Sequence, residues 1–344
     1  MSQELEILQN IPIFSKLSTQ DMLGVDLVWE LRTMSKGETL WYQGAPADAL
    51  AIVLQGALHI TINEQVLATI YKMDIVGELA TFTNNFRSAS VQIAEDATLL
   101  ILSKEALFAI RDTHWRFYER LLHLSLERIA KRIQDTNAKI SRSATDGIPL
   151  PLQADGFFFQ WAKKWNMVST PEPPSAISAL RKLPGLKNVH PTNLQAIMKA
   201  MKPVYIRQGK ELILEGQTGT SAFLLVEGVI DVYRNTKRNL VQHLVSLYPG
   251  ALLGTGALIL DEKRNASCLA SANTNIWVYE MSREDHDKLA GEPSVLWREA
   301  LLHSLAFQLR TADDVLVLAK QGHRPDTDYD KARGVLSGYQ GQDS

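Results

Sequence analysis

The chain has 344 residues, which is enough for two domains with a sizeable core in each. A hydrophobic content of 45% and a charged content of 22% are ordinary for a soluble protein, and a net charge of −2 predicts no general attraction to nucleic acid or anionic lipid. The single cysteine, Cys268, excludes an internal disulfide and a zinc site built from cysteines. No apolar run reaches the roughly 18 residues of a membrane span, and residues 1–6 lack a signal-peptide pattern, so we expect a cytoplasmic location without a membrane span.

The first part of the chain changes from a helical pattern to a strand pattern. Residues 7–23 are predicted helical, with an interruption at Ile11-Pro12. Short runs rich in β-branched and aromatic residues follow, at 39–42, 50–54, 57–62, 67–70, 91–93 and 99–102. Gly37, Gly44 and Gly56 lie between them, where the chain must turn sharply. Many short strands at regular spacing favour a closed β-roll over a parallel sheet.

Inside this strand region, Gly77-Glu78-Leu79-Ala80 is followed ten residues after the glycine by Arg87. The stretch is typical of a strand end, a tight turn and one helical turn, so that backbone amides and the arginine face one spot. Gly77 permits close approach of a ligand, and Arg87 can pair with phosphate oxygens through two parallel hydrogen bonds. Glu78 beside an anion site is suited to accepting hydrogen bonds from sugar hydroxyls. The combination predicts a site for a nucleotide phosphate with its ribose; the alternative is an ordinary turn with an exposed ion pair.

The same stretch resembles the phosphate-binding cassette of the cyclic-nucleotide-binding domain family. The resemblance implies that Glu78 holds the ribose hydroxyl and that Arg87 holds the cyclic phosphate. It further implies a pocket lined by Gly77, Leu79, Ala80, Ser88 and Ala89. The implied fold is mainly β with flanking α-helices, a jelly-roll-like β-roll followed by a long helix.

A heptad seam marks the predicted long helix after the roll. Its members step by four and three residues: Leu122, Leu126, Ile129, Ile133, Thr136 and Ile140. Such a seam either forms a homodimer through the helix around 122–140 or packs on its own barrel. The helix also resembles the dimer helix of the bacterial catabolite activators, and by that resemblance Thr136 and Asn137 would face the adenine.

The first domain recurs later in the chain. Pro12, Gly37, Gly44 and Gly56 have counterparts 172 residues on, at Pro184, Gly209, Gly216 and Gly228. Gly77, Arg87 and Ala89 have counterparts 177 residues on, at Gly254, Arg264 and Ala266. We expect the five extra residues in a hairpin at 235–239. This regular offset predicts a duplicated domain.

The second cassette departs from the first at the ribose position. Arg264 is kept, followed by Asn265, but Thr255 replaces the glutamate after Gly254. Losing a charged hydrogen bond costs about 1.5–3 kcal/mol, so Gly254, Thr255, Arg264 and Asn265 are expected to form a weaker site, a site for another ligand or a structural copy. A second heptad seam follows at Leu302, Leu305, Leu309, Ala312, Leu316 and Ala319.

These patterns divide the chain into four parts. We expect a first cyclic-nucleotide-binding domain at 1–140, a linker at 141–176 with an aromatic segment at 157–165, a degenerate second domain at 177–320, and a disordered tail at 321–344. The aromatic segment either packs between the barrels or docks a partner or a membrane surface.

The expected function is a non-catalytic receptor that binds a cyclic mononucleotide, with cAMP favoured over cGMP, and signals allosterically to an unidentified effector protein. No catalytic motif, metal-ligand spacing or DNA-recognition helix is found, so we expect no enzyme, no metal, no cofactor and no nucleic-acid partner. The tandem arrangement also resembles the regulatory subunit of protein kinase A, but no arginine-rich inhibitor segment is evident. The rival interpretations are a scaffold whose barrels have lost ligand binding and a cGMP receptor.

Overall fold

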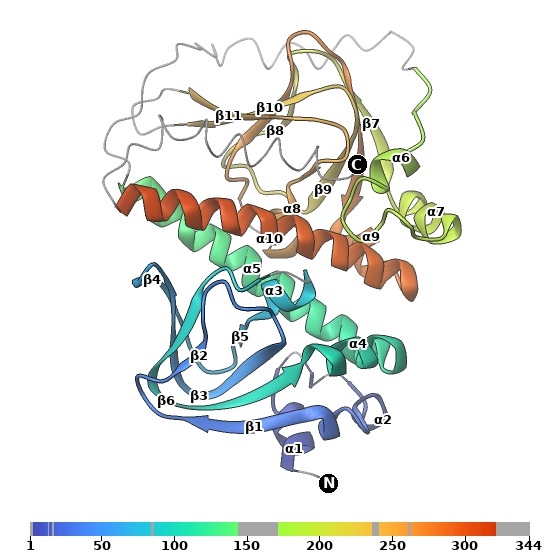
Figure 1. Ribbon diagram of the computed structural model, residues 1–344. Helices are drawn as coiled ribbons and strands as arrows, with labels where there is room; N and C mark the ends of the chain where they lie inside the picture. Colours follow the sequence, from blue (N-terminus) through green and yellow to red (C-terminus); the bar gives the residue numbers. More distant parts are fainter. Residues whose placement is uncertain are drawn as a thin grey trace. The chain divides into compact units, whose positions relative to one another are not determined.

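The computed structural model describes residues 3–12, 14–15, 17–83, 86–143, 171–235, 241–260 and 263–320 (Figure 1). The chain divides into two compact units, and each is described by itself. One unit joins residues 1–144 with the chain from Ala290 onward, and the other is Thr145–Leu289. The expected linker segment at 157–165 and the expected tail at 321–344 lie outside the described residues.

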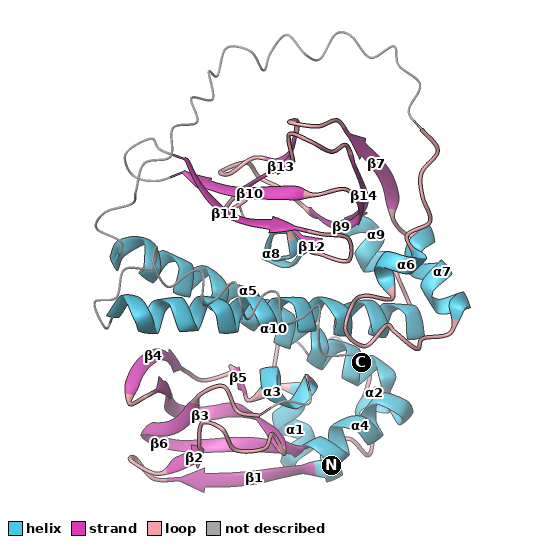
Figure 2. Cartoon of the chain, turned by 45° about the horizontal axis from the view of Figure 1, so that its top comes forward, coloured by secondary structure: helices cyan, strands magenta, loops and turns pink. Residues whose placement is uncertain are grey.

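The first unit contains one β-roll with short helices before it and long helices after it (Figure 2). Its strands are β1 (Trp29–Met34), β2 (Thr39–Trp41), β3 (Ala49–Ile62), β4 (Gln65–Ile70), β5 (Ile75–Val76) and β6 (Ser90–Ser103). Its helical elements are α1 (Gln3–Gln9), α2 (Thr19–Met22), the 3-10 helix η1 (Asp26–Val28), α3 (Glu78–Phe82), α4 (Lys104–Thr113), α5 (Trp115–Ser143) and α10 (Glu292–Lys320). The predicted mainly β class with flanking helices is therefore confirmed.

The six strands form an antiparallel sheet in the order β1-β6-β3-β4, with β2 paired to β6 and β5 to β3. Two pairs of predicted strands are each one long strand here, because β3 and β6 pair with one another over most of their length. The register shifts around Gly56, which has φ +85°, and a Cβ there would lie 2.3 Å from the Asp96 carbonyl oxygen. The glycine thus bends a continuous strand at a bulge instead of ending it.

The second unit repeats the pattern. Its strands are β7 (Lys202–Ile206), β8 (Glu211–Ile213), β9 (Ser221–Glu227), β10 (Ile230–Asn235), β11 (Val241–Leu247), β12 (Leu252–Leu253), β13 (Ser267–Ala270) and β14 (Ile276–Ser282). Its helices are α6 (Ile177–Leu180), α7 (Pro191–Lys199), α8 (Thr255–Leu260) and α9 (Arg283–Lys288). Two four-stranded antiparallel sheets, β11-β10-β13-β8 and β12-β9-β14-β7, enclose an apolar core with Ile213, Leu225 and Val278 at its centre. The expected hairpin insertion at 235–239 falls between β10 and β11, almost wholly outside the described residues.

The long helices α5 and α10 run side by side and in the same direction (Figure 1). Glu119 and Arg298 form an ion pair of 3.1 Å near their beginnings, and Thr136 lies next to Asp313 seventeen residues further along α5. The α5 seam residues Leu122, Leu126 and Ile129 are completely buried within this chain. This part of the seam therefore packs within its own chain, as one of the two predicted alternatives, and the homodimer stays a prediction that light scattering can test.

Because α10 packs against α5, it belongs to the first unit and not to the second. The sequence assigned it to the second domain, at 177–320, but its contacts group it with residues 1–144. Leu316 of the second predicted seam lies in the core of the first roll, together with its neighbour Val317. The long helix that follows the second roll in the sequence thus packs on the first roll.

Candidate ligand site in the first roll

The turn before α3 is shaped by Gly77. Its φ of +82° is the left-handed region that side chains rarely adopt, and a Cβ there would lie 2.7 Å from Nη1 of Arg87 and from the ring of Trp41. Thr81 fastens the helical turn by donating from its hydroxyl to the carbonyl oxygens of Gly77 at 2.8 Å and Ala49 at 2.7 Å. The sequence therefore folds locally into the tight turn that the cassette predicted.

Arg87 lies at the centre of this turn and is only 4% exposed. Its Nη1 donates to the carbonyl oxygen of Gly77 at 3.2 Å, and its Nη2 donates to Ala49 O at 2.7 Å and to an Asp48 carboxylate oxygen at 2.9 Å. The guanidinium carbon is 3.8 Å from the centroid of the Trp41 ring, so the cation lies against an aromatic face. Burial lowers the pKa of Arg87 below its usual value, and Asp48 and Glu78 offset part of that shift. Within the ranges that the structure describes, its Nε has no hydrogen-bond partner.

Glu78 is the most unusual group of the site. It is 1% exposed, and in the described part of the chain neither carboxylate oxygen has a donor in hydrogen-bonding geometry. Burial raises the pKa of Glu78, and the charge of Arg132, the nearby backbone amides of Glu78 and Leu79 and the charge of Arg87 offset part of that rise. A buried acceptor without a donor is destabilising by about 1–3 kcal/mol, so this carboxylate is suited to a ligand that brings donors.

The remaining residues predicted for the pocket are close chain neighbours of Glu78 and Arg87. Leu79 and Ala80 are buried on α3, Ala89 is buried at the start of β6, and Ser88 is half-buried beside Arg87. Gly77, Glu78 and Arg87 are brought together as the sequence predicted. Asp48 and Trp41 were missed, and the only signal for them is that each precedes a strand or ends one near the predicted turn.

The two residues expected at the base, Thr136 and Asn137, lie on α5. The hydroxyl of Thr136 is buried and donates to a carboxylate oxygen of Asp313 on α10 at 3.4 Å, and Asn137 is half-buried. Thr136 therefore faces the second long helix, and its role toward a base stays a prediction. Arg132, one turn earlier, is 3.7 Å from the other Asp313 oxygen.

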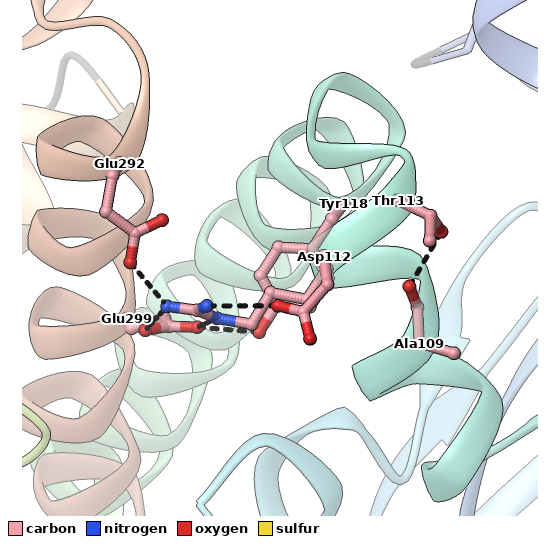
Figure 3. Close-up of polar contacts among 7 residues, drawn as sticks. Ala109, Asp112, Thr113, Tyr118, Glu292 and Glu299 are labelled. Carbon is pink, nitrogen blue, oxygen red and sulfur yellow. Dashed lines mark hydrogen bonds and ion pairs between the residues drawn. The ribbon is translucent and has the colours of Figure 1, made fainter.

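A polar network joins the beginnings of α5 and α10 (Figure 3). Arg111 of α4 donates from Nε to Glu299 at 2.9 Å and from Nη2 to Glu292 at 3.0 Å, and the Tyr118 hydroxyl donates to Glu299 at 2.8 Å. Burial alone would lower the pKa of Arg111, but Glu299 and Glu292 raise it above its usual value. Burial and then Glu299 raise the pKa of Tyr118. These contacts border a cavity of about 400 Å³ that also reaches Phe82 of α3.

The second cassette keeps the arginine but loses its carboxylates. Arg264 is 8% exposed and donates to Gly254 O at 3.0 Å and to the Ser221 hydroxyl at 3.3 Å. Among the described residues Arg264 forms no ion pair, since Thr220 stands where Asp48 stands in the first roll and the buried Thr255 stands for Glu78. The carbonyl oxygen of Asn265 accepts from Arg234 at 3.4 Å, so it contributes to the turn around the arginine.

In the part of the chain that the structure describes, no helix is long and apolar enough to cross a membrane. Within the same residues, no three His, Cys, Asp or Glu side chains are grouped so that they could hold a metal ion.

Each of the two antiparallel β-rolls thus has a left-handed glycine, a short helix and a buried arginine in the same order along the chain. The chain belongs to the cyclic nucleotide-binding domain family, which matches residues 31–114 and 203–292, about half of the chain.

Individual relatives are more distant. The chain is 22% identical over 261 residues to cGMP-dependent protein kinase 2 of Homo sapiens, covering 76% of this chain and 27% of the relative. It is 30% identical over 130 residues to Glutaminase 1 of Bradyrhizobium diazoefficiens, covering 38% of this chain and 21% of the relative. A solved regulatory domain of Toxoplasma gondii PKA with cAMP covers 86% of this chain and 94% of its own, at 18% identity and a TM-score of 0.31. The chain thus spans about a quarter of the length of the curated relatives it matches.

Proposed function

We propose that the chain is a non-catalytic receptor that binds a cyclic mononucleotide in its first roll and signals to a separate effector protein. The observation that carries this proposal is the Glu78 carboxylate, which is buried and has no hydrogen-bond donor among the described residues, while the Arg87 side chain bonds to Gly77, the residue just before it. Ribose hydroxyls would donate to Glu78, and phosphate oxygens would accept from Arg87. A ligand that carries both groups a short distance apart is a nucleotide whose phosphate is held close to its ribose.

The charges of the site fit a ligand with one negative charge. Asp48 already compensates Arg87 at 2.9 Å, so the second negative charge of a phosphate monoester would be repelled by a carboxylate beside the same guanidinium. A cyclic phosphate diester carries a single charge, and it could share the guanidinium with Asp48. This reasoning favours a cyclic nucleotide over a free mononucleotide.

The base is less constrained than the sugar and the phosphate. Ser88, next to Arg87, could contact a guanine or only the phosphate, and the relatives named above include a kinase called cGMP-dependent and a PKA domain solved with cAMP. We keep cAMP as the first ligand to test and cGMP as its rival. No cofactor other than this ligand is part of the proposal.

The second roll is proposed to be a weaker or empty site. Thr255 supplies a neutral hydroxyl where Glu78 supplies a carboxylate, and Thr220 stands where Asp48 pairs with Arg87 in the first roll. The rival proposal for the whole chain, a scaffold that has lost ligand binding, would leave both rolls empty. A thermal-shift assay with cAMP and cGMP distinguishes the two, because a ligand that binds only the folded chain raises its melting temperature.

Isothermal titration of matched variants tests the site itself. Arg87→Lys keeps the charge but removes the parallel donors, and it should weaken binding at least about tenfold, as expected for losing about 1.5–3 kcal/mol. Arg264→Lys is the matched control at the equivalent position of the second roll, and it should leave the tight binding event unchanged. Equal affinity of wild type and Arg87→Lys would contradict the assignment.

A further inference from the structure

Helix α10 contacts the end of the short helix α3 of the first roll directly. Nη2 of Arg310 on α10 donates to the Thr83 hydroxyl oxygen at 3.0 Å. Thr83 is the C-terminal capping residue of α3, and its own hydroxyl donates to Leu79 O at 2.6 Å. A side chain of α10 is thereby bonded to the end of the short helix that carries Glu78.

About 9 Å further along α10, at the helical rise of 1.5 Å per residue, two apolar side chains enter the first roll. Leu316 is 1% exposed and Val317 is 7% exposed, and both lie in the apolar core that contains Val76 and Ala89. Val76 lies two residues before Glu78, and Ala89 lies two residues after Arg87. The end of α10 therefore belongs to the same apolar core as close chain neighbours of the two residues that the proposed ligand must reach.

Glu78 and Arg87 are closed to solvent in this arrangement, at 1% and 4% exposure. A nucleotide can reach them only if a covering element moves. The helix α5 is a poor candidate for large movement, because it continues from the roll through α4 and is fixed to it by the Arg128–Asp74 ion pair of 2.8 Å. The end of α10 is attached to the roll by side chains alone, so its release rearranges no strand.

We propose that the C-terminal part of α10 is a latch on the first pocket, so that a cyclic nucleotide binds there by displacing Leu316 and Val317. This inference rests on the proposed function, and it adds how the site is regulated. The beginning of α10 stays in place because Arg111 and Glu119 hold Glu299 and Arg298. The apparent affinity of the first roll is then its intrinsic affinity reduced by the fraction of molecules in which the latch is open.

The test is made on the full chain with hydrogen exchange and titration. In the absence of nucleotide, Leu316→Ala should speed exchange in residues 78–83 and 310–317 and leave 292–303 unchanged. With cAMP or cGMP, the same variant should bind at least about fivefold more tightly than wild type, since weakening the closed state raises the open fraction. Thr311→Ala is the matched control, because that hydroxyl donates only within its own helix, to Phe307 O at 3.1 Å.

Nucleotide should also speed exchange of residues 310–317 in wild type. If nucleotide slows that exchange and Leu316→Ala binds less tightly than wild type, α10 lines the occupied pocket. The latch is then wrong, but the proposed receptor function is unaffected. Binding of nucleotide with equal affinity by both proteins also overturns the latch alone. No binding by wild type or by Leu316→Ala, with melting temperatures unchanged by either nucleotide, overturns the proposed function itself.

Discussion

Thr136 on α5 donates a hydrogen bond to Asp313 on α10 across 3.4 Å, and these two residues occupy the same position in the two repeats. Asp313 follows Thr136 by 177 residues, the offset that also separates Arg87 from Arg264. The chain therefore pairs the equivalent helices of its own two repeats in register. A duplicated chain can in this way bury within one molecule a helix surface that a single repeat would expose.

That internal pairing predicts how the seam of α5 responds to a charge. Ile133 is 7% exposed, so Ile133→Asp places a carboxylate in an apolar interior and should lower the free energy of unfolding by about 3 kcal/mol or more. Chemical denaturation measures this change. Light scattering on the wild type should give the mass of one chain, and a wild-type dimer that Ile133→Asp converts into a folded monomer would contradict the internal role of the seam.

The turn at Gly77 predicts a difference between two glycines. Gly77 and Gly44 have φ of +82° and +81°, so alanine at either position is strained by about 1–2 kcal/mol. A Cβ at Gly44 meets nothing within 4 Å, whereas one at Gly77 lies 2.7 Å from Arg87 and Trp41. Gly77→Ala should therefore lower the melting temperature more than Gly44→Ala and should also weaken nucleotide binding. Equal melting temperatures would show that the turn is more open than the structure indicates.

Glu78 predicts a conflict between stability and binding that depends on pH. Its folded pKa is raised by burial, so the folded state binds more protons than the unfolded state between the unfolded and folded pKa values, and stability falls as pH rises through that window. Glu78→Gln removes the buried charge and should stabilise the ligand-free chain by about 1–3 kcal/mol at pH 7, with a smaller gain near the ordinary carboxyl pKa. Melting curves at several pH values measure this gain.

The control for that experiment is Glu95→Gln, since Glu95 is exposed on β6. It should change neither stability nor affinity, whereas Glu78→Gln should weaken nucleotide binding at the same time as it stabilises the free protein. A Glu78→Gln chain that is less stable than wild type at every pH would show that the carboxylate has a donor in the free protein.

The network of Figure 3 predicts that two carboxylates paired with Arg111, those of Glu299 and Asp112, contribute unequally to stability. Glu299 is 20% exposed at its side chain and accepts from both Arg111 and Tyr118, so Glu299→Gln should lower stability by about 1–3 kcal/mol. Asp112 is 3.5 Å from Arg111 but 77% exposed, so Asp112→Asn should change stability by less than about 0.5 kcal/mol. Urea denaturation compares them, and equal losses would mean that burial does not set the strength of these pairs.

The local features of the site were predictable from the sequence because each depends on neighbouring residues. The Gly77–Arg87 spacing, the missing glutamate at Thr255 and the constant offset between repeats are all present in the order of the amino acids. Alternation and turn glycines likewise determined the β-roll class. The predicted break in β3 was wrong because a glycine at a bulge, here Gly56, has the same pattern as a glycine at a turn.

Only the tertiary structure decided what surrounds the site. Asp48 reaches Arg87 across 39 residues, and α10 reaches Thr83 across 227, and neither contact has a periodic signal in the chain. Heptad spacing predicts that a helix buries a seam, but it does not say against which partner, since any apolar surface of the right shape lowers the free energy by a similar amount. Helix α10 packs on the first roll because polar contacts at its beginning, such as Arg111–Glu299, and apolar contacts near its end, such as Val317, form together in the folded chain.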